Sequence, residues 1–215
     1  MAFDYPVTLN LEGKLCLVAG SGPLACERMT GLLRARANVF IVTPNPSRAL
    51  AAQAGAFNVP LVLRPVTTGD LEGCELAIVT REDTHDIPAL HAAAQQHGVM
   101  FAALDDIAHC DFGAVSQIRR GSLTVTVSSG GRAPALAKRL RQRLEVELPT
   151  ELTELVEVIA QARRNHGPRE VEFDEWSARW SRALEDLDAL VAMLHRGDAA
   201  EVEAHILAAL RDEDH

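Results

Sequence analysis

Short apolar runs alternate with amphipathic segments over the first hundred residues. Runs typical of buried strands occupy residues 15–18, 39–42, 61–63, 76–80 and 100–104, and helical spacing of apolar residues occupies 25–34, 47–54 and 87–97. The last of these helices is expected to end at Gly98 in the left-handed conformation. Strands that alternate with helices form a parallel sheet with helices on its faces. Because such crossovers are right-handed, the pattern predicts a doubly wound α/β fold with its ligand crevice at the carboxyl ends of the strands.

The pattern changes after residue 105. Alternating residues predict two strands, 113–118 and 123–127, joined by a turn at 119–122. A basic amphipathic helix follows over 135–144, with Pro134 near its first position. A hairpin this small is marginal alone and needs another surface or a partner chain to cover it. These residues therefore predict a small α+β region.

Helical periodicity continues beyond Pro149. One helix is predicted from 152 onward and is broken at 165–168, a second covers 173–194, and a third covers 200–210. Together they predict an all-helical C-terminal domain. The chain is thereby divided into three parts, residues 1–112, 113–148 and 149–215.

The composition narrows the classes of function. The chain has 215 residues, of which 47% are hydrophobic and 24% are charged, as in ordinary globular proteins. Its formal net charge of −9 argues against a nucleic-acid partner. No apolar run approaches the length of a membrane span, and no basic segment leads into an apolar one at the N-terminus, so neither a membrane helix nor a signal peptide is expected. The four cysteines lack C-x-x-C spacing, so we expect no disulfides and a reducing, cytoplasmic location.

A glycine-containing turn joins the first predicted strand to the first helix. Its residues are Gly20, Ser21, Gly22, Pro23, Leu24 and Ala25, which fit the pattern G-x-G-x-x-A. In that pattern the first glycine permits a tight turn, the second lets the backbone approach a phosphate, and the small third residue lets the helix pack on the strand. The helix start adds free N–H groups and a positive dipole end. The turn therefore predicts a Rossmann-like dinucleotide site, with a simple structural turn as the alternative.

The second predicted strand is followed by Thr43-Pro44-Asn45, without the acid that commonly holds a nucleotide ribose. We expect Pro44 and Asn45 beside the adenosine ribose. Because no acid ends this strand, we also expect weak discrimination between NAD and NADP.

Asp105 follows an apolar strand that ends at Leu104, so it is expected at the carboxyl edge of the sheet. A carboxylate at that position would accept a proton or orient a substrate, and a helix cap or a solvated loop acid is the alternative. His109, Cys110 and Asp111 follow closely. Their spacing matches no closed zinc site, and no metal site is predicted.

A second small-residue segment precedes the basic helix. Its residues are Ser128, Ser129, Gly130, Gly131 and Arg132. Small residues at a helix start let the backbone approach a carboxylate or a phosphate. The helix adds four cations, Lys138, Arg139, Arg141 and Arg143. Such a run is usually a solvated face, but beside a glycine-rich turn in an acidic chain it favours a site for a polyanionic ligand.

Four segments, at residues 20–25, 104–106, 109–112 and 127–137, occur in the order and with the spacing of one known family. They resemble the precorrin-2 dehydrogenase/sirohydrochlorin ferrochelatase family of siroheme synthesis, including the N-terminal module of fused siroheme synthases. The resemblance covers about residues 5–148 well and the helical tail only in general character. It implies an NAD-binding domain, a dimerisation region formed by the hairpin and the following helix, and a helical C-terminal domain.

The resemblance also implies an activity, which is NAD-dependent oxidation of the tetrapyrrole precorrin-2 to sirohydrochlorin by a homodimer. Insertion of ferrous ion into sirohydrochlorin is a second activity of the family. Asp105 matches the family's catalytic aspartate, and Thr80 is expected beside the cofactor. The segment from Ser128 to Arg132 is expected to bind the many carboxylates of the substrate.

Differences from the family cluster on the dinucleotide side. Besides the missing acid after the second strand, Ser21 replaces the middle of three consecutive glycines, Glu27-Arg28 replaces an Arg-Lys pair, and Thr80-Arg81-Glu82-Asp83 stands where Ala-Thr-Asp is usual. They leave two alternatives: a chelatase or tetrapyrrole-binding protein with a degenerate NAD site, and a non-enzymatic nucleotide-sensing dimer.

Overall fold

The computed structural model describes residues 3, 5–83, 85–165 and 172–211. The chain divides into two compact units. The first comprises Met1–Ala114 and Gly130–Arg132, and the second comprises Val115–Ser129 and Ala133–His215.

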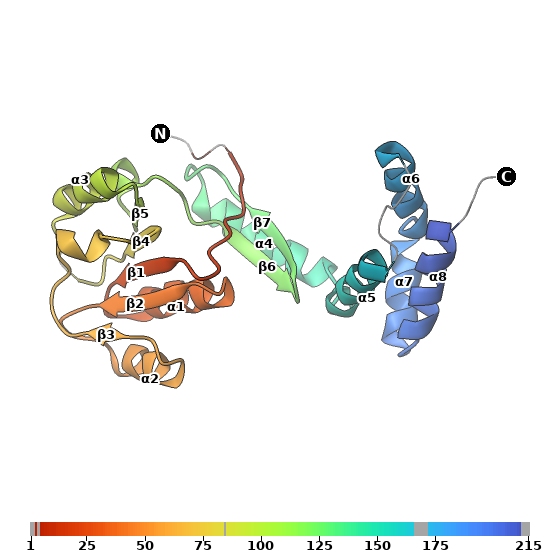
Figure 1. The fold of residues 1–215 in the computed structure, drawn as a ribbon, viewed down its shortest axis with the longest axis horizontal. Coiled ribbons are helices and arrows are strands. Elements are labelled where there is room, and N and C mark those ends of the chain that lie inside the picture. The colour runs from red at the N-terminus through yellow and green to blue at the C-terminus, as the bar shows by residue number, and fades with distance from the viewer. Residues whose placement is uncertain (1–2, 4, 84, 166–171, 212–215) are drawn as a thin grey trace. The chain divides into compact units, whose positions relative to one another are not determined.

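The first unit is built on a five-stranded parallel sheet (Figure 1). Its strands are β1 (Leu15–Ala19), β2 (Asn38–Val42), β3 (Leu61–Val62), β4 (Leu76–Val79) and β5 (Met100–Ala103). They lie in the order β3-β2-β1-β4-β5, and every neighbouring pair is parallel. The connections contain α1 (Pro23–Arg34), α2 (Arg48–Ala56), the 3-10 helix η1 (Thr68–Leu71) and α3 (Ile87–His97). This arrangement confirms the doubly wound parallel sheet predicted from the sequence.

Both faces of this sheet are covered. Val18 of β1 belongs to a buried cluster with Met29 of α1 and Leu50 of α2, whereas the preceding Leu17 belongs to a second cluster with Leu90 of α3. Successive side chains of a strand point to opposite faces, so α1 and α2 lie on one face and α3 on the other. The sheet is thus buried on both sides, which explains why its strands read as continuous apolar runs.

Local signals set the ends of the helices. The Ser47 hydroxyl accepts a hydrogen bond from the Leu50 N–H at 3.2 Å and caps α2, and the Asp86 carboxylate caps α3 through the Ala89 N–H. Gly98 ends α3 with φ 69°, which confirms the predicted left-handed C-cap.

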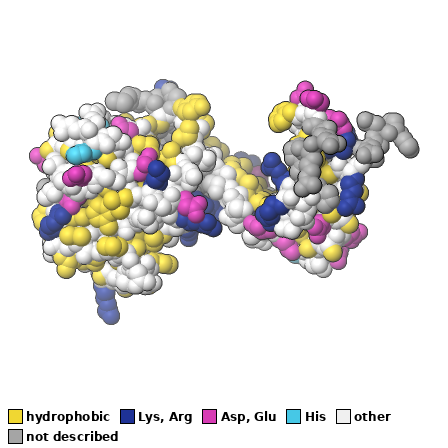
Figure 2. Space-filling model, in the orientation of Figure 1, with side chains coloured by type: hydrophobic (Ala, Val, Ile, Leu, Met, Phe, Trp, Pro, Cys, Tyr) yellow, Lys and Arg dark blue, Asp and Glu magenta, His cyan; other side chains and the backbone are white. Residues whose placement is uncertain are grey.

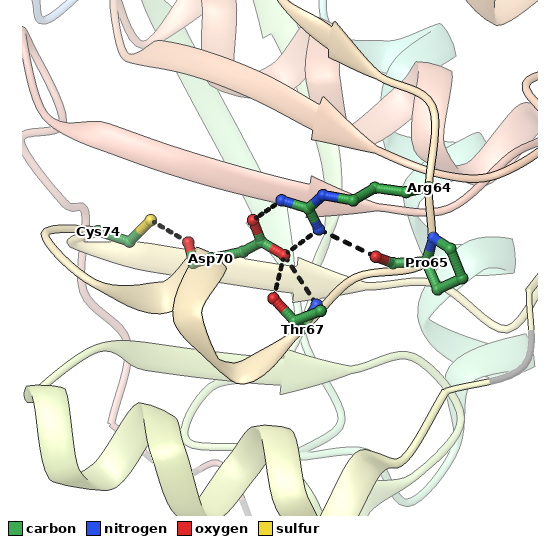
Figure 3. A network of polar contacts seen from close by, with 5 residues as sticks. All are labelled: Arg64, Pro65, Thr67, Asp70 and Cys74. Atoms are coloured by element: carbon green, nitrogen blue, oxygen red, sulfur yellow. Dashed lines mark hydrogen bonds and ion pairs between the residues drawn. The ribbon is translucent and has the colours of Figure 1, made fainter.

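A polar network fixes the connection between β3 and β4 (Figure 3). The Asp70 carboxylate accepts two hydrogen bonds from the Arg64 guanidinium, at 2.8 and 2.6 Å, and two more from the N–H and hydroxyl of Thr67. These donors, above all Arg64, hold the pKa of Asp70 below its ordinary value of 3.8. The Cys74 thiol contacts the Asp70 carbonyl, and burial raises the pKa of this thiol to about 11.

The second unit begins with an antiparallel hairpin, β6 (Ser116–Arg120) and β7 (Leu123–Val127). The predicted four-residue turn is wrong in extent, because Arg119 and Arg120 pair with Thr124 and Leu123 inside the ladder. Only Gly121 and Ser122 form the turn, and Gly121 takes φ 59°, as tight hairpin turns require.

Five helices follow the hairpin in the described part of the chain. They are α4 (Pro134–Glu147), α5 (Leu152–Asn165), α6 (Phe173–Ala183), α7 (Leu187–His195) and α8 (Ala199–Arg211). The single helix predicted over 173–194 is wrong: it is divided into α6 and α7, because the Asp186 carboxylate accepts the Ala189 N–H and starts a new helix. The break predicted at 165–168 lies, from residue 166 on, outside the described residues.

Aliphatic side chains of α5, α7 and α8 form the core of the helical part. Trp176 and Trp180 of α6 pack against this core, and their two rings meet edge to face. None of the helices in the described ranges is long and apolar enough to cross a membrane. On the face seen in Figure 2, hydrophobic side chains gather over part of the first unit, while the second unit shows acidic and basic side chains intermixed.

Candidate functional site

The glycine turn follows β1 directly, and its first glycine is required by a close approach to β4. Thr80, which follows β4 and is 1% exposed, donates its N–H to the Ala19 carbonyl at 2.8 Å. A Cβ built on Gly20 would lie 1.9 Å from the Thr80 hydroxyl oxygen. The structure therefore brings Gly20 and Thr80 together, and a side chain at position 20 would force Thr80 to move.

A carboxylate of the protein binds the start of α1. Glu82 accepts hydrogen bonds from the backbone N–H groups of Gly22 at 2.7 Å, Leu24 at 2.8 Å and Ala25 at 3.4 Å. The Thr80 hydroxyl donates to the same carboxylate at 3.1 Å. Three N–H groups that converge on one anion at a helix N-terminus are the arrangement that binds phosphate in dinucleotide sites. The donors of this turn thus fit a dinucleotide pyrophosphate.

The other residues of the turn hold it in place. Pro23 is the first residue of α1, and Ala25 is fully buried against the sheet. The Ser21 carbonyl accepts the Ser47 N–H at 2.7 Å, which ties the turn to the start of α2. Pro44 and Asn45 follow β2, the strand beside β1, where Pro44 is half-buried and Asn45 is exposed.

An acid does stand at the end of β2, although none follows that strand in the sequence. Thr43, which is buried, donates its hydroxyl to the Asp83 carboxylate at 2.7 Å. Asp83 belongs to the loop after β4, and this loop passes over the end of β1 to reach β2. Glu82 and Asp83 were not predicted as site residues from the sequence. The signal available was a run of three charged residues, Arg81 to Asp83, directly after a buried strand.

Asp105 lies two residues beyond β5, at the carboxyl edge of the sheet as expected. Its backbone takes φ 72°, a left-handed conformation that Asp and Asn tolerate better than other side chains. The Asp105 carboxylate is 64% exposed and pairs with the Arg81 guanidinium at 2.5 Å. The loop after β4 therefore also holds the candidate catalytic group.

The segment after Asp105 folds back on β5. The Asp111 carboxylate accepts the Phe101 N–H at 2.8 Å, the His109 ring lies 2.8 Å from the Asp106 carboxylate, and the Cys110 thiol contacts the Ala103 carbonyl. Burial raises the pKa of the Cys110 thiol. Among the residues that the structure describes, no group of three or more His, Cys, Asp or Glu side chains could hold a metal ion. These side chains instead fix the backbone that carries Asp105.

The predicted substrate segment is divided between the two units. Ser128 and Ser129 belong to the second unit, and the Ser129 hydroxyl accepts the Ala133 N–H at 2.9 Å. Gly130, Gly131 and Arg132 belong to the first. There a Cβ on Gly131 would lie 3.7 Å from the Ile107 side chain, which is part of the short 3-10 helix η2 (Ile107–His109) just after Asp105.

Within the basic helix, only part of the charge is directed at other residues of α4. Arg141 and Arg143 pair with acids four positions further on, at 2.5 and 3.7 Å, and Lys138 and Arg139 are exposed.

Comparison with known proteins gives a consistent result. A family model described as "Putative NAD(P)-binding" matches residues 7–116, and one described as "Sirohaem biosynthesis protein central" matches residues 120–147. The siroheme synthase of Nitrosomonas europaea is 33% identical over 207 residues, which are 92% of this chain and 42% of that protein. Siroheme synthase 1 of Pectobacterium atrosepticum is 35% identical over 153 residues, 71% of this chain and 32% of that protein.

A solved structure also matches nearly the whole chain. The structure of SirC, precorrin-2 dehydrogenase, superposes with a TM-score of 0.69 at 18% identity and covers 98% of this chain and 100% of its own. This match supports the fold. The chain spans less than half the length of the curated relatives named above. The family resemblance and the NAD cofactor predicted from the sequence both agree with these matches.

Proposed function

We propose, from the premise that this chain belongs to the putative NAD(P)-binding family, that it oxidises precorrin-2 to sirohydrochlorin with NAD as hydride acceptor. The observation that carries the proposal is the anion-binding turn at the start of α1, at the same sheet edge as Asp105. The siroheme synthases and the precorrin-2 dehydrogenase among the matches support this choice of substrate.

The residues that would hold NAD lie along three neighbouring strand ends. The N–H groups of Gly22, Leu24 and Ala25 would bind the pyrophosphate. Asn45 and the Asp83 carboxylate, which stands at the end of β2, would meet the adenosine ribose. NAD, when bound, supplies the group that takes up hydride from the substrate.

Asp105 is the group that would act on the macrocycle. Its carboxylate is 64% exposed, and the side chain of Ile107, two residues further along the chain, lies beside Gly131. Removal of hydride from precorrin-2 is accompanied by loss of protons, so a carboxylate at this position would accept a proton. The exposed Arg132, in the same unit, would attract a carboxylate of the substrate.

The same carboxylate favours a second activity, which is insertion of ferrous ion into sirohydrochlorin. Insertion requires the loss of two pyrrole protons, and a base beside the macrocycle would assist that loss. Ferrous ion would enter here as a substrate.

A homodimer through the hairpin and α4 is part of the proposal. On α4, Leu136 is 57% exposed, Leu140 is 42% exposed and Val146 is 87% exposed. Leu136 and Leu140 are four residues apart and share one face of the helix. A second copy of this region would cover that face and support a hairpin that is marginal alone. The four cysteines are free thiols, which supports a reducing compartment such as the cytoplasm.

The proposal is tested by incubating the protein with precorrin-2 and NAD and recording the spectrum of sirohydrochlorin and the absorbance of NADH. Asp105→Asn is the informative variant, because asparagine tolerates the left-handed backbone at this position. We expect it to lower turnover at least ~10²-fold while NAD affinity stays unchanged. Asp106→Asn, whose carboxylate is engaged with His109, is the matched control and should retain most of the activity.

Each alternative predicts a different result in this assay. Ferrous insertion without NAD reduction would favour a chelatase with a degenerate NAD site. NAD binding without any change of the tetrapyrrole would favour a nucleotide-sensing dimer. Full turnover by Asp105→Asn would contradict the role given to that residue.

A further inference from the structure

The loop after β4 makes three separate polar contacts along the sheet edge. Arg81 pairs with Asp105 beyond β5, Glu82 binds the turn after β1, and Asp83 accepts a hydrogen bond from Thr43 after β2. On the basis of the NAD binding proposed above, we propose that Glu82 is an internal competitor of the dinucleotide. Its carboxylate takes the place of the pyrophosphate, and the dinucleotide binds when the Glu82 side chain leaves the turn.

The first support is that both anions need the same donors. Gly22, Leu24 and Ala25 each direct one backbone N–H toward the Glu82 carboxylate. A backbone N–H group at a helix start has one hydrogen to donate, and these are the groups that a pyrophosphate uses in a turn of this pattern. With Glu82 in place, the donors are already engaged.

The second support is that both anions need the same space. A Cβ built on Gly22 would lie 2.4 Å from one carboxylate oxygen of Glu82 and 2.6 Å from its carboxyl carbon. The second glycine of the pattern exists so that a phosphate can approach the backbone closely. Here that space contains the carboxylate. A pyrophosphate and a carboxylate in contact with the same N–H groups would also repel each other. Joint occupancy of the turn is therefore excluded by both volume and charge.

The contacts on either side of Glu82 determine what has to move. The side chains before and after Glu82 hold the loop in place. Arg81 donates a hydrogen bond to Asp105 at 2.5 Å, and Asp83 accepts one from Thr43 at 2.7 Å. Glu82 can therefore leave by rotation of its own side chain, while Asp83 stays at the end of β2. Glu82 then sets the affinity for the dinucleotide, because the apparent dissociation constant equals the intrinsic one divided by the fraction of molecules with an open turn.

The experiment compares NAD binding by the full chain with that of Glu82→Ala and Glu82→Gln, using calorimetry and thermal unfolding with and without NAD. We expect Glu82→Ala to bind NAD about 10-fold more tightly, which corresponds to a turn closed in roughly nine of ten molecules. Without NAD, the same variant should unfold at a lower temperature, because the N–H groups lose their partner. The rise in unfolding temperature on adding NAD should be larger than in the parent.

Glu27→Gln is the matched control. It removes a carboxylate from α1 that is 65% exposed, pairs with Arg28 and makes none of the contacts in the turn. It reports the effect of removing one negative charge near a bound anion, and it should leave NAD affinity within about 2-fold of the parent.

The outcomes separate this inference from the proposed function. Equal or weaker NAD binding by Glu82→Ala, with binding by the parent intact, overturns the competition and leaves the proposed function standing. Failure of the parent and of every variant to bind NAD overturns the proposed function, and the competition with it. A purely structural role for Glu82 would lower the unfolding temperature with and without NAD by the same amount, which also overturns the competition.

Discussion

Substitution of Gly20 by alanine should mainly lower the stability of the fold, whereas substitution of Gly22 by alanine should mainly lower the affinity for NAD, although the two positions are only two residues apart. At Gly20 the new Cβ would lie 1.9 Å from the Thr80 hydroxyl oxygen and 3.0 Å from the Thr80 Cβ. At Gly22 the three atoms nearest to the new Cβ all belong to the end of the Glu82 side chain. The first glycine should therefore matter for folding and the second for binding.

The cost at Gly20 can be worked out from these contacts. Rotation of Thr80 would remove the hydroxyl contact, but the 3.0 Å contact with its Cβ remains in every rotamer. The backbone at Gly20 also has φ 156°, which L side chains rarely adopt. Overpacking and an unfavourable backbone conformation each cost about 1–3 kcal/mol, so we expect Gly20→Ala to lose roughly 3 kcal/mol. For a chain of this size that is about 6–12 °C in thermal midpoint.

The cost at Gly22 is smaller. Its backbone, with φ −121° and ψ −152°, is open to any residue. The Glu82 carboxylate can move toward solvent, and water can replace it at the N–H groups. Gly22→Ala should therefore change the free energy of unfolding by no more than about 1 kcal/mol. Its methyl group would remain in the phosphate space, so NAD affinity should fall at least ~10-fold.

Thermal unfolding and calorimetry with NAD measure both effects in the same samples. Thr80→Ala supplies the check, because it removes two of the three atoms that the Gly20 methyl would meet. The double variant should recover at least about 1 kcal/mol relative to the sum of the single changes. If Gly20→Ala is as stable as the parent, or Gly22→Ala binds NAD equally well, the division of roles between the two glycines is refuted.

Two further predictions concern the rest of the molecule. Leu140→Glu should place a charge in the exposed apolar face of α4 and convert the proposed dimer to monomers in light scattering, whereas Lys138→Glu should not; a parent that is monomeric at micromolar concentration would contradict the dimer. Asp70→Asn should lower the thermal midpoint at neutral pH. Because the pKa of Asp70 is lowered in the folded protein, mainly by Arg64, this stabilisation is present above pH 3.8 and is lost as the pH falls through the folded-state pKa. The difference between parent and variant should therefore shrink below pH 3.8, and a constant difference would contradict the assignment.

The fold could be predicted from the sequence where one local pattern determines one element. The parallel sheet follows from continuous apolar runs between helices, because strands buried on both faces cannot alternate. Gly98 marks the end of α3, because glycine adopts the left-handed backbone conformation at a helix end with little cost in free energy. The division of 173–194 into two helices was missed, because the apolar spacing continues across it. The cap residue, Asp186, was the available signal.

The candidate site was predicted less completely, and the reason is the order of the strands. Gly20, Gly22 and Ala25 are local and follow a known pattern. Glu82 and Asp83 lie some sixty and forty residues from the groups they bind, as the partners Gly22 and Thr43 show. They reach those groups because β4 pairs with β1, and β1 pairs with β2. The local sequence of the loop does not determine which strand ends the loop crosses, because that depends on the order of the strands in the sheet.

The presence of a carboxylate in this turn follows from the same physics that makes the turn a phosphate site. Three N–H groups directed at one point are costly to leave without an acceptor when they are partly shielded from water. N–H groups that donate more strongly would therefore bind the Glu82 carboxylate and the pyrophosphate more tightly by similar amounts. Under the proposed binding mode, a dinucleotide would displace Glu82 through contacts that the side chain does not make, at the ribose proposed to lie beside Asn45 and beside Asp83, which accepts a hydrogen bond from Thr43. Selectivity for a whole dinucleotide over a small anion would then come from those contacts, and Glu82 would set the threshold that they must exceed.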